Sequence, residues 1–321
     1  MKKNELLIKE ENINIFRPQN FNDYIGQENI KENLKISINA IQKRQETLDH
    51  IIFYGPPGLG KTTLANIIAK ELCANIKIIS APAIEKTGDL ASILTLLEKG
   101  DILFIDEIHR LPRQIEEILY SAMEDYKLDI IINNGNTTEP IRIELEPFTL
   151  IGATTRIGML SNPLRDRFGL SFRMKYYTKE ELNIILNNAI KLFDKEFIDN
   201  SVEKISEKSR GTPRIGLNLL KRVRDFTDFH NIDKIDEKSI EDCFKKLGIF
   251  NYGLDELDIK YLRILKDNNR IVGLKTISSI LSEDIRTIEE VIEPFLIQEG
   301  LIEITSKGRI GTIKLKDLDL S

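Results

Sequence analysis

The residues Gly55–Thr62, Gly-Pro-Pro-Gly-Leu-Gly-Lys-Thr, have the composition and spacing of a phosphate-binding loop. Glycines allow backbone N–H groups to turn inward around phosphate oxygens, and a helix that begins near Lys61 adds its positive N-terminal end. The Lys61 ammonium can reach the β- and γ-phosphates, and the Thr62 hydroxyl can bind Mg²⁺. An accidental glycine-rich turn is the alternative, which the flanking patterns disfavour. The loop predicts a site for ATP and Mg²⁺ in which Gly58 and Gly60 contact the nucleotide.

Two adjacent carboxylates, Asp106 and Glu107, end the apolar run Ile102–Ile105. Charges beside a core are costly to desolvate unless something compensates them. If this run is a strand beside the one that enters the phosphate loop, Asp106 lies next to Mg²⁺, where a carboxylate is compensated. Glu107 can then polarise the attacking water as a general base. The alternative is an acidic pair that caps the following helix. We expect Thr62 and Asp106 as metal ligands.

These groups need a scaffold that brings the ends of separate strands together. The segments "HIIFY", "DILFIDE" and "FTLIGATT" have the pattern of buried strands, and "KTTLANIIAKEL" and "IEEILYSAMEDY" have helical periodicity. Strands that alternate with helices favour a parallel sheet covered on both faces. We therefore predict an α/β fold with a P-loop parallel-sheet core.

The second half of the chain has a different pattern. From about Thr178 onward strands disappear, and amphipathic helices follow one another. After residue 250, three helical segments precede "LIEITSKGRIGTIKL", which is typical of a two-stranded hairpin around Ser306–Gly311. We predict three domains: a large ATPase domain (1–177), an all-helical lid (178–250) and a C-terminal winged-helix head (251–321).

Composition excludes several classes of protein. Apolar residues at 41% and charged residues at 30% describe an ordinary globular protein. The two cysteines, Cys73 and Cys243, lie far apart, so neither a disulfide framework nor a zinc-binding spacing is present. The N-terminal residues contain no apolar signal segment, and no run of about eighteen apolar residues exists. We expect a cytoplasmic protein without a membrane span.

Six motifs occur in an order that resembles one family: "GPPGLGKTT", "LFIDEIHR", "AMEDY", "GATTR", "PLRDRFG" and "RGTPR". From about Phe16 to Arg309 the chain is similar to the RuvB family of AAA+ motors, which drive Holliday-junction branch migration. The resemblance implies an AAA+ core, a helical lid and a DNA-contacting head, assembled as homo-hexameric rings around duplex DNA in recombination and repair. It also implies ATP and Mg²⁺ as cofactors.

The resemblance assigns further residues to the nucleotide pocket. It implies that Phe16 and Arg17 line the adenine site and that Thr63 joins Thr62 at the phosphates. Either Thr154 or Thr155 would act as the sensor of the γ-phosphate. Contacts from the lid side would come from Tyr177 and Arg214, with Arg214 as the second sensor. The alternatives are purely structural roles: Phe16 could be a core aromatic residue, and "RGTPR" could be only the start of a helix at Pro213.

Other motif residues are implied at the contact between subunits. Glu124, Asp125 and Tyr126 resemble the family's residues at the nucleotide-bearing interface, although a solvated helix end is the alternative. "PLRDRFG" supplies a candidate arginine finger for a neighbouring γ-phosphate, Arg167 first and Arg165 second. An intrachain salt bridge is the competing interpretation.

A hairpin is predicted between Tyr126 and Phe148. Ile141, Ile143 and Leu145 alternate with charged residues, opposite a turn at residues 133–136. Such an insertion, at about 128–147, exposes apolar surface unless it is docked. The resemblance implies contact with the junction-binding partner RuvA, and an indirect link to the resolvase RuvC where present; internal packing is the alternative.

Basic residues of the head are the candidate DNA contacts. Lys307, Arg309 and Lys314 are predicted on the wing, and Arg286 lies in the preceding helical segment. The chain departs from the family pattern where Ile285 and Ile304 replace arginines. Phosphate contacts are expected, because a motor must move along any sequence; ordinary solvated charges are the alternative.

Two other functions are compatible with the phosphate loop. A clamp-loader-type AAA+ ATPase shares the loop and the interface arginine, and a protein-remodelling ATPase could grip polypeptide with the hairpin. We find no aromatic-glycine pore motif typical of the latter. The winged-helix pattern favours a DNA-translocating ATPase, with Lys61, Glu107 and Arg167 in catalysis.

Overall fold

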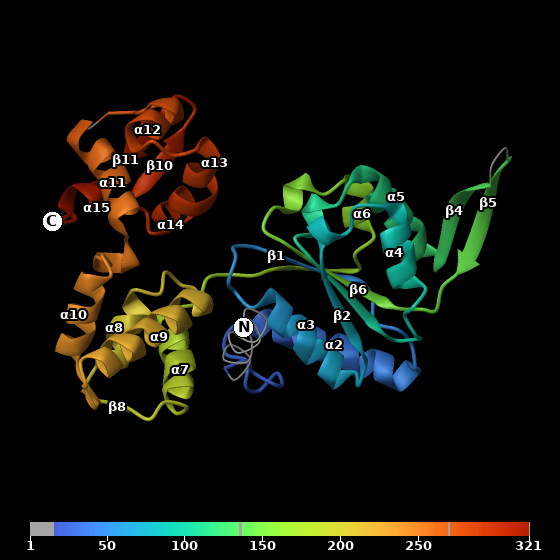
Figure 1. Ribbon diagram of the computed structural model, residues 1–321, viewed down its shortest axis with the longest axis horizontal. Helices are drawn as coiled ribbons and strands as arrows, with labels where there is room; N and C mark the ends of the chain where they lie inside the picture. Colours follow the sequence, from blue (N-terminus) through green and yellow to red (C-terminus); the bar gives the residue numbers. More distant parts are fainter. Residues whose placement is uncertain (1–15, 135–136, 269, 321) are drawn as a thin grey trace. The chain divides into compact units, whose positions relative to one another are not determined.

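The computed structural model describes residues 16–134, 137–268 and 270–320 of the 321-residue chain. The chain divides between Tyr177 and Thr178 into two compact units. The first contains a parallel sheet with its helices, and the second contains a helical lid and a winged-helix head (Figure 1). No helix among the described residues is both long enough and apolar enough to span a membrane.

Five parallel strands form the sheet of the first unit, in the order β2-β3-β6-β1-β7. Their bounds are β1 Ile51–Tyr54, β2 Ile76–Ser80, β3 Ile102–Asp106, β6 Thr149–Thr154 and β7 Leu170–Arg173. The three central strands are buried almost throughout, which explains their uninterrupted apolar sequences. Because all five strands are parallel, their carboxyl ends meet at one edge.

The order of the strands corrects one expectation from the sequence. β6 lies between β3 and β1: Ile51 of β1 pairs with Ile151, and Ile102 of β3 pairs with Thr149. The prediction that β3 runs directly beside β1 is therefore wrong. All three strands are short apolar runs, and nothing local in such runs specifies the neighbour. Asp106 still lies at the same sheet edge as the phosphate loop, since β6 is parallel to both strands.

Helices cover both faces of this sheet (Figure 1). The helices are α2 Glu28–Arg44, α3 Lys61–Glu71, α4 Thr87–Leu94, α5 Arg113–Glu124 and α6 Asn162–Asp166, with short 3₁₀ turns η1 Ala81–Ala83, η2 Ile108–Arg110 and η3 Ile157–Met159. Leu90 of α4 and Leu119 of α5 pack with Leu103 of β3 in one buried cluster. Ile108 belongs to the same cluster and is fully buried, which anchors η2 at the end of β3.

A hairpin extends from the end of α5. β4 Lys127–Asn134 and β5 Thr137–Glu144 pair antiparallel from Lys127↔Glu144 to Asn134↔Thr137 (Figure 1). The backbone N–H of Leu145 donates to the Tyr126 carbonyl at 2.8 Å, which closes the base of the hairpin. Leu128 and Leu145 are buried there. Gly135 and Asn136 of the predicted turn lie outside the described residues, as do residues 1–15.

The lid contains four helices: α7 Lys179–Ile190, α8 Ser201–Glu207, α9 Pro213–Phe229 and α10 Glu237–Lys246. Two short strands also occur, β8 Glu196–Phe197 and β9 Lys234–Ile235, paired in parallel. The expectation that this region contains no strands is therefore wrong. Two residues are too few to show alternation in a sequence, and the pair forms only when the connections after α7 and α9 meet.

The head combines helices with a two-stranded wing. Its elements are η4 Asn251–Gly253, α11 Glu256–Asn268, α12 Leu274–Leu281, α13 Ile285–Thr287, the π turn η5 Ile288–Ile292, α14 Glu293–Gln298, β10 Ile302–Thr305, β11 Gly308–Gly311 and α15 Ile313–Asp317. Lys314 lies in α15 and not on the wing, contrary to the prediction. Its ammonium donates to the Glu299 carbonyl at 2.7 Å.

Candidate nucleotide-binding and catalytic site

The phosphate loop connects β1 to α3 and depends on its glycines. Gly55, Gly58 and Gly60 have φ angles of 137°, 79° and 98°, which side chains disfavour. A Cβ atom on Gly60 would lie 2.6 Å from the hydroxyl oxygen of Tyr24, and one on Gly55 would lie 2.7 Å from a backbone carbonyl oxygen. The loop can therefore hold this conformation only with glycine at these positions.

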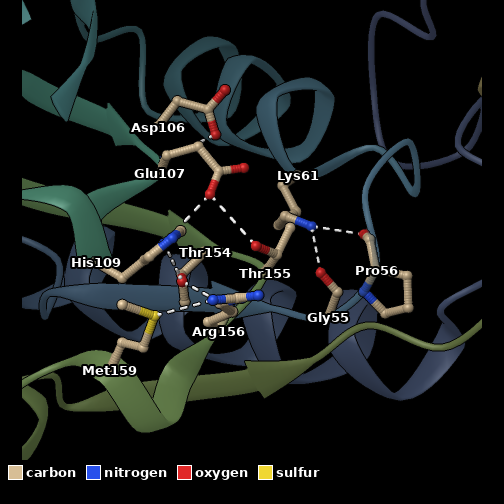
Figure 2. Close-up of polar contacts among 10 residues, drawn as sticks. All are labelled: Gly55, Pro56, Lys61, Asp106, Glu107, His109, Thr154, Thr155, Arg156 and Met159. Atoms are coloured by element: carbon tan, nitrogen blue, oxygen red, sulfur yellow. Dashed lines mark hydrogen bonds and ion pairs between the residues drawn. The ribbon is translucent and has the colours of Figure 1, made fainter. Parts of the chain in front are cut away.

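Lys61 begins α3 and is 8% exposed. Its ammonium donates to the carbonyl oxygens of Gly55 and Pro56, both at 2.7 Å, so the side chain curls over the loop (Figure 2). Thr62 and Thr63 follow in the first helical turn and are half-buried. A cation, inward-turning amides and a helix N-terminus together fit a chain of phosphates. This combination makes the loop a nucleotide-binding site.

Asp106 and Glu107 lie where β3 ends, at the same edge of the sheet (Figure 2). The Asp106 carboxylate accepts the backbone N–H of Glu107 at 3.0 Å. Glu107 has a φ of 50°, a left-handed conformation that costs free energy for a residue other than glycine. Its carbonyl accepts the N–H of Arg110 at 2.8 Å, which helps to hold this turn. The turn directs the Glu107 carboxylate toward the end of β6.

Two threonines at the end of β6 face this carboxylate differently. The Thr155 hydroxyl donates to Glu107 Oε2 at 3.4 Å. The Thr154 hydroxyl oxygen is fully buried, accepts the backbone N–H of Arg156 at 2.9 Å and lies 2.9 Å from His109 Nδ1. Thr155 is therefore the better placed of the two for sensing a phosphate, although that role stays a prediction.

Two tyrosines support the phosphate loop from behind. The hydroxyl oxygens of Tyr24 and Tyr177 lie 3.1 and 3.2 Å from the carbonyl oxygen of Leu59, and 3.0 Å from one another. Both rings are buried. Tyr177 was expected at the nucleotide, and the structure places it against the loop that would hold the nucleotide. Tyr24 was not foreseen, because nothing in its local sequence signals a contact 35 residues away.

The oxygen atoms near the loop fit Mg²⁺ better than a softer metal. Thr62 offers a hydroxyl and Asp106 a carboxylate, which are hard ligands. Within the described ranges, no group of three or more His, Cys, Asp or Glu side chains could hold a metal ion by itself. Mg²⁺ is commonly bound by one or two protein oxygens together with phosphates. The donor set therefore fits a metal that arrives with a nucleotide.

The predicted adenine-pocket residues lie at the start of the described chain. Phe16 is half-buried and Arg17 is exposed. The Arg17 carbonyl accepts the side-chain amide of Gln19 at 2.8 Å, and Gln19 also accepts a hydrogen bond from Lys70 of α3. This segment is thus attached to the helix that follows the phosphate loop.

The predicted interface residues are used inside the first unit. Arg167 follows α6 and is ion-paired with Glu124, while its Nη1 donates to the Pro163 carbonyl at 3.0 Å. The Arg167 Nε is buried and has no hydrogen-bond partner among the described residues. Arg165, the second candidate finger, is exposed, and its Nη2 donates to the side-chain oxygen of Asn162 at 3.1 Å.

The other two members of "EDY" differ in exposure. Asp125 is exposed at the end of α5. Tyr126 has a φ of 52°, and its ring packs edge-on against His50 and Phe148 at centroid distances of 6.5 and 5.9 Å. Burial raises the pKa of the Tyr126 hydroxyl. Tyr126 therefore has a packing role within its own domain, whatever it does at an interface.

The motif "RGTPR" lies at the start of α9 in the second unit. Pro213 is the first helical residue and Arg214, the predicted second sensor, is exposed beside it. Arg210 is turned toward the head instead: its Nε donates to the Gly253 carbonyl at 2.7 Å, and its guanidinium is ion-paired with the buried Asp258. Part of this motif therefore links the lid to the head.

The candidate DNA contacts also separate by exposure. Arg286 and Lys307 are exposed. Arg309 lies on the wing strand β11, but its side chain is only 11% exposed, and its Nε donates to Glu293 at 2.8 Å and its Nη2 to Glu289 at 3.2 Å. These carboxylates raise the pKa of Arg309. The alternative that Arg309 is an ordinary solvated charge of the wing is therefore wrong. A DNA phosphate would have to compete with Glu289 and Glu293 for the Arg309 guanidinium.

Comparisons with known proteins agree with this architecture. Residues 16–174 match the model of the "Holliday junction DNA helicase RuvB P-loop domain", residues 177–249 match the RuvB AAA lid domain, and residues 251–317 match the RuvB C-terminal winged helix domain.

Relatives and solved structures extend the match to nearly the whole chain. The "Holliday junction branch migration complex subunit RuvB" of Campylobacter hominis is 58% identical over 299 residues, covering 93% of this chain and 88% of the relative. The Helicobacter pylori protein of the same name is 56% identical over 299 residues, covering 93% and 89%. The Thermotoga maritima RuvB Holliday junction branch migration motor superposes with a TM-score of 0.82 at 45% identity, covering 93% of this chain and 96% of that structure. On all three domains, and at these identities, the chain belongs to the RuvB family.

Proposed function

We propose that this chain is an ATP-hydrolysing motor subunit that drives branch migration at Holliday junctions. The observation that carries the proposal is that one chain combines a phosphate loop, an Asp-Glu pair at the same sheet edge and a winged-helix head. The relatives named above are branch migration subunits, and the similarity covers every domain. The activity belongs to the cytoplasm, where chromosomal DNA would be the substrate.

Binding of ATP is assigned to the phosphate loop and its supports. The Lys61 ammonium already lies over the loop, where it binds two carbonyl oxygens. When ATP binds, it would exchange these partners for phosphate oxygens. Thr62 and Asp106 would hold Mg²⁺, which supplies positive charge at the β- and γ-phosphates when bound. Tyr24 and Tyr177 keep the Leu59 carbonyl in place, and thereby the curvature of the loop.

Hydrolysis is assigned to Glu107 acting on a water molecule. A carboxylate can accept a proton from water as the water attacks phosphorus. The left-handed backbone at Glu107 and its hydrogen bond from Arg110 fix the base of this side chain. Thr155, one residue beyond β6, would report the presence of the γ-phosphate to the same carboxylate.

Assembly and partners follow from the surface elements. We assign Arg167 as the arginine finger of a homo-hexamer, with Glu124, Asp125 and Tyr126 on the same side of the domain. The hairpin β4–β5 would contact the junction-binding partner RuvA, with RuvC acting indirectly through the junction. Arg286 and Lys307 of the head would contact phosphates of duplex DNA.

The test is ATP-dependent conversion of a synthetic four-way junction into duplex products, with and without the junction-binding partner. The proposal requires conversion that depends on ATP, rises with the partner and disappears in Lys61→Ala. ATP turnover is measured in parallel with duplex DNA, with a sliding clamp and with unfolded protein. Stimulation by a clamp or by unfolded protein, without junction conversion, would instead identify a clamp loader or a protein-remodelling ATPase.

A further inference from the structure

His109 lies between the predicted general base and the sensor strand. Its Nδ1 is 3.2 Å from Glu107 Oε2 and 2.9 Å from the hydroxyl oxygen of Thr154 (Figure 2). The His109 side chain is 8% exposed, that of Glu107 is 32% exposed, and Thr154 is fully buried. One imidazole nitrogen thus connects the carboxylate at the end of β3 to the end of β6.

The chemistry of these atoms decides which way the hydrogen bonds run. A carboxylate only accepts hydrogen bonds, so the contact with Glu107 is favourable when Nδ1 carries its proton. Thr154 Oγ1 already accepts the N–H of Arg156, and it can accept a second hydrogen bond from Nδ1. Nδ1 is therefore in hydrogen-bond contact with Thr154 and within ion-pair distance of Glu107, and the Thr155 hydroxyl donates to the same carboxylate at 3.4 Å.

The ring of His109 is not required to hold its own backbone. The turn η2 is anchored by Ile108, which is fully buried in the core, and by hydrogen bonds from Arg110 to the Glu107 carbonyl and from Leu111 to the Ile108 carbonyl, at 2.8 and 3.2 Å. The backbone of the turn is thus held by contacts other than those of the imidazole with Glu107 and Thr154.

We infer that His109 is a positioning residue for ATP hydrolysis, an inference that rests on the proposed function. It holds the Glu107 carboxylate at the end of β6 and ties its orientation to Thr154. Thr155 is the next residue, so a displacement of the β6 end toward a γ-phosphate moves Thr154 as well. The connection through His109 passes that displacement to the general base, and water is polarised only when the phosphate is in place.

The test compares three variants in the full-length protein. His109→Ala removes the donor, His109→Asn keeps an amide N–H close to the position of Nδ1, and Arg113→Ala is the control on a side chain that is 89% exposed at the start of α5. Steady-state ATP hydrolysis gives kcat and KM, and a fluorescent ADP analogue gives the dissociation constant of nucleotide.

We expect His109→Ala to lower kcat by about ten- to a hundred-fold, as small misplacements of reacting groups do, with nucleotide affinity within about two-fold of wild type. His109→Asn should recover most of kcat, and Arg113→Ala should behave as wild type. In a Glu107→Gln background, His109→Ala should have no further effect, because the group it positions is already absent.

Two results separate this inference from the function on which it rests. A wild-type protein that does not hydrolyse ATP would overturn the proposed function and the role of His109 together. An active wild type in which His109→Ala keeps its kcat, in which Asn fails to rescue it, or in which the loss adds fully to that of Glu107→Gln, would overturn the role of His109 alone.

Discussion

At the scale of single residues, the left-handed conformation of Glu107 has a direct consequence for substitution. Its φ of 50° costs free energy for a residue other than glycine, and the hydrogen bond from the N–H of Arg110 helps to hold the turn. Glutamine has the same size and backbone preferences as glutamate, whereas its amide is not basic. The substitution Glu107→Gln therefore separates structure from catalysis at this position.

We expect Glu107→Gln to keep nucleotide affinity and lose at least about a hundred-fold in kcat, because general base catalysis contributes roughly that much. Lys61→Ala should instead weaken nucleotide binding itself, by removing the cation that faces the phosphates. Binding of a fluorescent ADP analogue and steady-state hydrolysis distinguish the two variants. Normal turnover by Glu107→Gln would show that another group accepts the proton.

Several residue contacts could not be predicted from the sequence, because they join distant positions. The motifs identified Lys61, Asp106 and Glu107 from local spacing alone. Tyr24 meets the phosphate loop 35 residues later, and Arg309 meets Glu293 at a distance of 16 residues. No local pattern encodes such pairs, which depend on how the elements pack.

At the scale of elements, His50 connects β6 to the end of α5. Its Nδ1 accepts the backbone N–H of Leu150 at 2.9 Å, so Nε2 carries the proton and donates to the Met123 carbonyl at 3.0 Å. Burial lowers the pKa of His50, against a smaller opposing effect of the Met123 hydrogen bond. Protonation on Nδ1 would remove the acceptor for Leu150.

This geometry predicts the sign of a pH effect on stability. The unfolded chain binds a proton at His50 with the ordinary pKa of about 6.5, and the folded chain binds it only at lower pH. The unfolded state therefore gains more protons on acidification, and stability falls as the pH drops below about 6.5. We expect the thermal midpoint to fall between pH 7.5 and 5.5, and His50→Gln to reduce that dependence. The exposed His230→Gln serves as control; an equal pH dependence in wild type and His50→Gln would contradict the assignment.

The wing provides a matched pair of substitutions, one buried and one exposed. Arg309 faces Glu293, which is 2% exposed, so Arg309→Ala leaves a buried carboxylate without its cation. We expect a loss of about 3–5 kcal/mol in head stability from that variant. Lys307→Ala should leave stability unchanged, weaken duplex binding about equally for all sequences and flatten the salt dependence by roughly one unit of slope.

Thermal unfolding of both variants measures the predicted loss of stability, and duplex titrations at several salt concentrations measure the predicted change in DNA binding. If Arg309→Ala stays fully stable and only its salt slope changes, then Arg309 contacts phosphate as the sequence suggested, and its ion pairs are dispensable. An unchanged slope in Lys307→Ala would remove the wing from the DNA interface.

The sequence predicted the buried strands of the sheet and missed the half-exposed ones. β1, β3 and β6 are buried almost throughout and have mostly apolar sequences that are recognisable as strands, whereas the edge strands β2 and β7 are half-exposed and mix lysine, serine and arginine with apolar residues. The order of the strands in the sheet could not be predicted from the sequence, because long crossovers connect parallel neighbours and no local pattern specifies which strands pair. The division between Tyr177 and Thr178 coincides with a predicted change of periodicity, and the further boundary at residue 250 stays a prediction.

At the scale of the whole molecule, the position of Arg167 raises the question of which subunit it serves. In the isolated chain its guanidinium is paired with Glu124 and lies over the ring of Tyr120 at 5.2 Å, while Nε is buried without a hydrogen-bond partner among the described residues. The ion pair with Glu124 would have to open before this guanidinium could reach a γ-phosphate of a neighbouring subunit.

Mixed oligomers test whether Arg167 acts on a neighbour. Arg167→Ala and Lys61→Ala subunits should each be inactive alone. If the site is shared, an equal mixture should recover a fraction of wild-type hydrolysis, because some interfaces combine an intact loop with an intact arginine. The control is a mixture of Arg165→Ala and Lys61→Ala subunits, in which the Arg165→Ala subunits should be active even without the mixing. No recovery in mixed oligomers that demonstrably form would assign Arg167 to its own subunit.

The hairpin has a consequence for how such a protein can change over generations. It leaves the domain at Lys127 and re-enters at Glu144, which are paired with each other, and the bond between Leu145 and Tyr126 closes the domain beneath it. Substitutions, insertions or deletions beyond that bond do not reach β3, which carries Asp106, or β6, which ends at Thr154. If the hairpin contacts the junction-binding partner, as proposed, selection can alter the recognition of that partner while the ATPase machinery stays constant. A protein built in this way can drift in its associations without passing through inactive intermediates.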